Sequence, residues 1–130
     1  MKYCLDTSVC VEIMRKGEDF DAIELDLSKC TISSIARFEL EYGIQKAPIK
    51  IKDKLETRLA LLLDNVQCAA FDDQAAIHAA NIRAELEKMG TPIGHFDTLI
   101  AGHAQAQKLA IVTGNSREFE RVPKLKVISI

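Results

Sequence analysis

The sequence lacks the features of a membrane or secreted protein. No stretch of about eighteen apolar residues occurs anywhere in the chain, which excludes a membrane-spanning helix. The N-terminus reaches an acid at Asp6, too early for the apolar core of a signal peptide. Internal repeats, low-complexity tracts and linkers are also missing. We therefore expect a cytoplasmic protein whose 130 residues form one domain, residues 1–130.

Cysteine pairs and an excess of basic residues are missing too. The four cysteines include no CxxC pair, which argues against a zinc site or a disulfide scaffold. We expect Cys4, Cys30 and Cys68 to be buried in strands as small apolar residues. The formal net charge is −2, whereas nucleic-acid-binding proteins usually carry a net positive charge.

One segment is nevertheless basic, and a local basic patch can steer a polyanion even when the total charge is negative. A run of this kind is equally typical of a solvated helix face, so these residues are candidates for phosphate contacts only. The candidates are Lys46, Lys50, Lys52, Lys54 and Arg58.

Short apolar runs alternate with segments of helical periodicity along the whole chain. The expected strands are residues 2–6, 30–33, 66–71, 109–113 and 126–130. The expected helices are residues 9–16, 19–27, 35–47, 51–64, 72–89 and 97–108. This alternation predicts an α/β protein whose mostly parallel sheet is covered by helices on both faces.

Acidic residues stand at separated junctions of this pattern. Asp6 ends the first strand, Asp97 opens a helix, and Glu118 follows the run that ends at Thr113. The carboxyl ends of parallel strands converge on one crevice, where ligands bind. Carboxylates gathered there repel one another unless a hard cation such as Mg²⁺ or Mn²⁺ neutralises them. The pattern therefore indicates metal-dependent chemistry on a phosphate substrate.

Glu39 needs a separate explanation because of its position in the helix at residues 35–47. At 100° per residue, Ile35, Phe38, Glu39 and Tyr42 share one side, which we expect to face the core. Glu41 falls on the polar side. A carboxylate on an apolar face is costly unless it has a partner, so Glu39 is a candidate for the site.

Helix capping is the simpler interpretation of two of these acids. Asp6 and Asp97 both precede or open helices, where the helix dipole favours a negative charge. Capping explains neither Glu39 nor the occurrence of four such acids. The histidines His78, His95 and His103 are not expected to be ligands, because a hard cation does not need imidazole.

The segments that carry the acids resemble a known family. They are Leu5-Asp6-Thr7-Ser8, Ile35 to Gly43, Ile93 to Ala101, and Val112 to Phe119, and they occur in this order. Together they resemble a PIN domain, specifically the VapC-type ribonuclease toxins of bacterial and archaeal toxin–antitoxin pairs. The resemblance covers essentially the whole chain and implies a PIN-like three-layer α/β/α sandwich with a central sheet of about five strands.

The resemblance also implies roles for individual residues. Asp6, Glu39 and Asp97 match the family's regular acidic positions, with Asp6 and Asp97 as direct ligands of Mg²⁺ or Mn²⁺. For the fourth position, Asn115 is a possible weaker ligand and Glu118 is the acid. Thr7 and Thr113 match hydroxyl positions that orient a carboxylate or a water molecule.

The same resemblance implies an activity and partners. It implies a metal-dependent endoribonuclease that hydrolyses RNA phosphodiester bonds, with the anticodon stem-loop of tRNA as one target. It further implies inhibition by a cognate VapB-type antitoxin and a homodimer.

The same residues leave three alternative functions to consider. A response-regulator receiver needs adjacent acids after the first strand, whereas Asp6 stands alone. A haloacid-dehalogenase-type phosphatase needs a second Asp where Ser8 stands. The third alternative is a catalytically inactive PIN-like module that binds RNA or protein.

Overall fold

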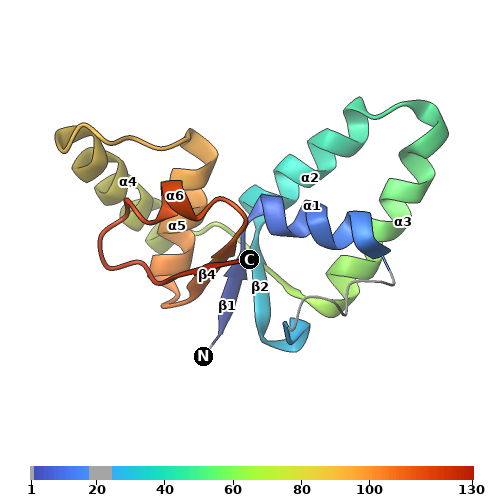
Figure 1. Ribbon diagram of the computed structural model, residues 1–130, viewed down its shortest axis with the longest axis horizontal. Helices are drawn as coiled ribbons and strands as arrows, with labels where there is room; N and C mark the ends of the chain where they lie inside the picture. Colours follow the sequence, from blue (N-terminus) through green and yellow to red (C-terminus); the bar gives the residue numbers. More distant parts are fainter. Residues whose placement is uncertain (1, 18–24) are drawn as a thin grey trace.

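The computed structural model describes residues 2–17 and 25–130 (Figure 1). Its sheet has five strands in the order β3-β2-β1-β4-β5, and every neighbouring pair is parallel. The strands are β1 (Tyr3–Leu5), β2 (Cys30–Ser33), β3 (Gln67–Ala69), β4 (Ala110–Thr113) and β5 (Val127–Ser129). The expected α/β fold with a parallel five-stranded sheet is confirmed.

Helices connect the strands. They are α1 (Thr7–Lys16), α2 (Ser34–Lys46), α3 (Ile49–Asn65), α4 (Asp73–Lys88), α5 (His95–Ala106) and α6 (Ser116–Phe119), with a 3-10 turn η2 (Leu27–Lys29) before β2. The helix expected at residues 19–27 lies largely outside the described residues. The helix expected at 97–108 begins two residues earlier, at His95. In the described part of the chain, no helix is long and apolar enough to cross a membrane.

Two hydrophobic cores lie on the two faces of the sheet because successive strand residues point to opposite sides. Leu5 and Val112 pack with α1, α2 and α3, whereas their neighbours Cys4 and Ile111 pack with α4, α5 and α6. Figure 1 shows the same division, with α1, α2 and α3 on one side of the sheet and α4 and α5 on the other. The result is a three-layer α/β/α arrangement.

The cysteines differ in environment. Cys4 and Cys30 are buried, as predicted, and burial raises the pKa of the Cys4 thiol to about 12. The prediction for Cys68 is wrong, since this residue is exposed. Cys68 belongs to β3, a strand at the edge of the sheet, and short apolar runs do not reveal which strand lies at an edge.

Candidate active site

The site is built at the carboxyl end of the central strand β1. Asp6 follows Leu5 directly and is only 3% exposed. Its backbone N–H donates to the carbonyl of Val112 in β4 at 3.1 Å, which joins the end of β1 to its neighbour. Since β2 and β4 flank β1, the segments that follow them meet at Asp6.

The carboxylate of Asp6 is held on both oxygens. Oδ1 accepts hydrogen bonds from Ser8 Oγ at 2.7 Å and from the backbone N–H of Val9 at 3.0 Å. Oδ2 accepts from Thr113 Oγ1 at 2.5 Å. Asp6 is therefore the N-cap of α1, as the capping interpretation of this acid expects. Capping and a site role coexist, because capping fixes the carboxylate where the strands end.

Two threonines have the orienting position expected of them. Thr7 Oγ1 donates to Glu39 Oε1 at 2.6 Å. Thr113, which is fully buried, donates to Asp6 and accepts the backbone N–H of Asn115 at 2.8 Å. Each hydroxyl links elements far apart in sequence, so both acids are positioned by the fold rather than by neighbouring residues alone.

Asp97 is the acid on which the charges of the other three act. Burial raises its pKa to about 7, with further contributions from hydrogen bonding to Glu118 and from the negative charges of Glu118, Asp6 and Glu39. The N-cap of α5 is Gly94, and Asp97 lies in the first turn, where the helix dipole still favours a negative charge. The dipole does not account for the other acids, whose negative charges all act on Asp97.

The expectation for the buried side of α2 is wrong. The residues that α2 buries are Ala36, Leu40 and Ile44, whereas Phe38 and Tyr42 are exposed. Glu39 lies at the boundary, half-buried, next to Thr7. The aromatic residues of this helix face outward because the α1 and α3 side chains pack on the Leu40 side.

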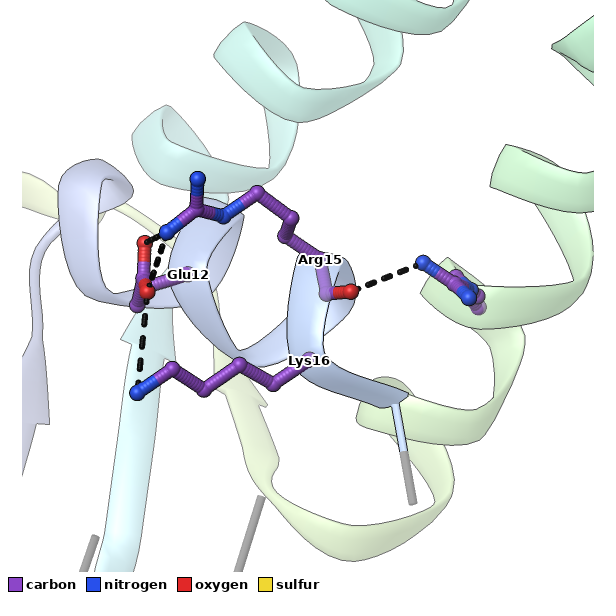
Figure 2. Close-up of polar contacts among 4 residues, drawn as sticks. Glu12, Arg15 and Lys16 are labelled. Atoms are coloured by element: carbon purple, nitrogen blue, oxygen red, sulfur yellow. Dashed lines mark hydrogen bonds and ion pairs between the residues drawn. The ribbon is translucent and has the colours of Figure 1, made fainter. Parts of the chain in front are cut away.

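Asn115 joins the hydrogen bonds around the acids through its backbone N–H, which donates to Thr113 Oγ1. The residue is exposed and lines a hollow of about 400 Å³ together with Ser8, Glu12 and Lys16. Glu12 is an additional acid near the site, but Arg15 and Lys16 both turn back towards it, at 2.6 and 3.7 Å (Figure 2). These cations, Arg15 first, lower the pKa of Glu12, so its charge is already balanced.

The basic residues lie on the α2–α3 hairpin. Lys50 and Lys54 are exposed on α3, and Lys52 Nζ donates to Gln45 at 3.5 Å. Arg58 differs from them, because its Nη1 donates to the carbonyls of Met14 and Arg15 at the end of α1, at 2.8 and 3.1 Å. Figure 2 draws the bond that the Arg15 carbonyl accepts. These bonds give Arg58 a structural task that the sequence pattern did not indicate.

Sequence reasoning missed one contributor to the site. Ser8 donates to Asp6 and also accepts the backbone N–H of Gly114 at 3.2 Å. Its position two residues after Asp6 is the available signal, since a hydroxyl at that spacing commonly bonds back to an Asp in a helix cap.

Comparison with known proteins identifies the family of this fold. The PIN domain family model matches residues 3–125. The chain belongs to the PIN-domain family, among the VapC ribonucleases. The tRNA(fMet)-specific endonuclease VapC of Salmonella typhimurium is 40% identical over 98% of this chain and 96% of its own length. Ribonuclease VapC2 of Rickettsia felis is 37% identical over 96% of this chain and 95% of its own length.

Solved structures give the same result for this PIN domain. The structure of VapBC2 from Rickettsia felis bound to a promoter DNA fragment matches with a TM-score of 0.89 and 34% identity, over 100% of this chain and 99% of that chain. DNA-bound VapBC from Salmonella typhimurium matches with a TM-score of 0.84 and 39% identity, over 99% of this chain and 98% of that chain.

Proposed function

We propose that this PIN domain is an endoribonuclease that depends on Mg²⁺ or Mn²⁺ and cleaves RNA at the site of Asp6, Glu39, Asp97 and Glu118. The observation that carries the proposal is that hydrogen bonds fix Asp6 and Glu39 at the carboxyl end of the sheet, where burial, together with their charges and that of Glu118, raises the pKa of Asp97 to about 7. Such a group has little reason to persist in a protein unless positive charge enters it.

The donor set fits a hard cation. All four side chains offer carboxylate oxygens, which Mg²⁺ prefers, and Mg²⁺ keeps several waters, so few protein ligands suffice. In residues 2–17 and 25–130, no three His, Cys, Asp or Glu side chains lie close enough together to hold a metal ion as they stand, so a cation would have to draw the acids together. The proposed direct ligands are Asp6 and Asp97, with Glu39 and Glu118 beside them.

The proposed roles follow from the hydrogen bonds. A cation bound here would supply positive charge beside the phosphate and a water molecule of lowered pKa. Asp6 is fixed by Ser8, Val9 and Thr113 and cannot turn away from the site. Thr7 occupies Oε1 of Glu39, which leaves the second oxygen to hold the cation or to orient the attacking water.

The substrate that we propose is a structured RNA, with tRNA as the first candidate. The Salmonella typhimurium relative is named a tRNA(fMet)-specific endonuclease, and it aligns with nearly the whole chain. Proteins read structured RNA largely through its shape and through unstacked loops, which favours the anticodon stem-loop as the cleaved region.

A VapB-type antitoxin is the proposed protein partner. The matching solved structures are VapBC complexes, and the acidic site offers an arginine of such a partner a strong charge-assisted contact. We also propose a homodimer. Mixing this chain with its antitoxin should abolish RNA cleavage, and size-exclusion chromatography with light scattering should give twice the mass of 14.4 kDa for the toxin alone.

The experiment for the activity compares two matched aspartates. Asp6 and Asp72 are both N-caps whose carboxylates accept a backbone N–H at 3.0 Å, and Asn caps a helix as well as Asp does. Asp6→Asn should abolish cleavage of total cellular RNA in Mg²⁺ or Mn²⁺, whereas Asp72→Asn should cleave like the wild type. EDTA should abolish RNA cleavage by the wild type and by Asp72→Asn.

One outcome would overturn the proposal in favour of an inactive binding module. That outcome is a folded, antitoxin-free wild-type protein that cuts no RNA at any Mg²⁺ or Mn²⁺ concentration. Equal cleavage by wild type and Asp6→Asn would instead show that the activity belongs to another site or to a contaminant.

A further inference from the structure

Three aromatic rings are exposed beside the acidic group. Phe38 and Tyr42 of α2 are 54% and 55% exposed, and Phe96 of α5 is 44% exposed. The chain has only five Phe, two Tyr and no Trp, so a large part of its aromatic content lies on this surface. Phe119, by comparison, is fully buried in the core.

The rings form one continuous strip. The planes of Phe38 and Tyr42 differ by 9°, with centroids 6.3 Å apart, and Phe96 lies 5.6 Å from Phe38 at a tilt of 40°. Lys46 Nζ lies 5.1 Å from the centroid of Tyr42. Residues 38, 42 and 46 are each four positions apart and therefore share one face of α2. We call Phe38, Tyr42, Phe96 and Lys46 the aromatic strip.

The strip begins at the acids. Phe38 directly precedes Glu39, and Phe96 directly precedes Asp97. The pair of rings therefore spans the same two helices that supply two of the four carboxylates. From there the strip follows α2 towards Lys46, at the start of the lysine-bearing α2–α3 hairpin.

A nucleic-acid strand has the chemistry that this strip can recognise. Bases stack on aromatic faces, and a neighbouring cation pairs with the phosphates. Two nearly parallel rings followed by an ammonium group match that alternation of flat apolar bases and anionic phosphates. Aromatic residues are also common at protein interfaces, so the antitoxin is the competing occupant that the test must separate from RNA.

We propose that the aromatic strip stacks unpaired bases of the RNA substrate next to the scissile phosphate. The inference rests on the proposed ribonuclease function and adds the surface that holds the unpaired bases beside the site. Bases inside a duplex are already stacked on both faces, so a paired segment cannot use the strip. The strip thus selects loops and helps to place the phosphate over the carboxylates.

The test measures binding without cleavage. The inactive variant Asp97→Asn is titrated with a short single-stranded RNA that contains 2-aminopurine, whose fluorescence falls when it stacks. Phe38→Leu and Tyr42→Leu are added to this background, because leucine keeps apolar area and removes the ring face. The matched control is Leu61→Ala. Leu61 is an apolar residue of α3 outside the strip, and it is 54% exposed.

The expected result is quenching of 2-aminopurine by the Asp97→Asn protein and by its Leu61→Ala control. Phe38→Leu and Tyr42→Leu should each reduce the quench and weaken RNA binding by about 5- to 100-fold, the range for loss of one base–aromatic stack. A fully paired RNA hairpin stem should bind without quenching. Thermal melts check that all variants are folded.

Two results would overturn the inference. One is unchanged affinity and quenching in both ring variants, which removes the strip from RNA binding even if wild-type protein cleaves RNA. The other is loss of antitoxin binding in the ring variants with RNA binding intact, which assigns this surface to the protein partner. The ribonuclease proposal fails separately, through the cleavage comparison of Asp6→Asn with Asp72→Asn.

Discussion

Thr7 and Glu39 are joined by a 2.6 Å hydrogen bond across 32 positions of the sequence, with the Thr7 hydroxyl as donor. The bond ties the first turn of α1 to the middle of α2 and fixes one carboxylate oxygen of a proposed site residue. Thr7 touches neither cation nor substrate in this account, and it acts by positioning Glu39.

Removal of this hydroxyl should slow cleavage without unfolding the protein. Thr7→Val keeps the shape of the side chain but frees Glu39, and loss of such a supporting contact typically costs about 10- to 100-fold in activity. We expect the loss in kcat with little change in KM, measured on a tRNA or oligonucleotide substrate. Thr7→Ser should restore the rate, whereas an equally slow Thr7→Ser would point to a packing role for the methyl group.

Thr113 should matter for stability as well as for the site. Thr113→Val would leave Asp6 Oδ2 without its partner in a buried place and would also remove the acceptor of the Asn115 N–H. An unsatisfied buried polar group costs about 1–3 kcal/mol, which urea denaturation resolves. Thr113→Ser keeps the hydroxyl and is the control. Equal stability of wild type and Thr113→Val would show that the hydroxyl contributes nothing to folding.

The metal-free protein should lose stability as the pH rises. The folded pKa of Asp97, about 7, lies above its ordinary value of 3.8, so the folded state holds the proton more tightly. That advantage is fully present below about pH 3.8 and disappears as the pH rises through 7. Above about pH 7, Asp97 is ionised and repels the other carboxylates.

Asp97→Asn should remove this pH dependence. At pH 8 without metal, the variant should be more stable than the wild type by roughly 1–2 kcal/mol, allowing for solvent screening. This corresponds to about 3–8 °C in Tm by differential scanning calorimetry. The difference should shrink at pH 4, and Glu41→Gln on the exposed side of α2 should show no such trend. A constant difference at both pH values would contradict the coupling.

Two glycines inside helices should respond in opposite ways to alanine. A Cβ on Gly102 of α5 would lie 2.5 Å from the backbone of Ala79 in α4, so the two helices would have to separate. We expect Gly102→Ala to cost 1–3 kcal/mol or more, about the range for overpacking. Gly43 of α2 has open space around it, and Gly43→Ala should stabilise by roughly 0.5–1 kcal/mol. Similar effects at both positions would contradict the close helix crossing.

The location of the acids could be predicted from the sequence because it follows from topology. Once strands and helices alternate, Asp6 and the segment after Thr113 must lie at the same end of the sheet. The position of Glu39 near Asp97 is harder to predict. Helical periodicity separates Glu39 from the solvent-facing Glu41, but it does not show which residue Glu39 approaches. The proposed roles of the acids as ligands are still a prediction.

The outward face of α2 could not be predicted, for a physical reason. Periodicity identifies a face but not what covers it, and the side with Phe38 and Tyr42 looked like core while Leu40 and Ile44 were the buried residues. The role of Arg58 was hidden for a similar reason. Its contacts with Met14 and Arg15 are more than forty positions away in sequence, where local patterns carry no information.

The most direct test of the central claim, one cation site shared by four acids, is Mn²⁺ binding by isothermal titration calorimetry, which requires no substrate. We predict that wild-type protein binds Mn²⁺, that Asp6→Asn and Asp97→Asn bind it at least tenfold more weakly, and that Glu41→Gln binds it normally. Equal Mn²⁺ affinity in the wild type and both aspartate variants would contradict the account.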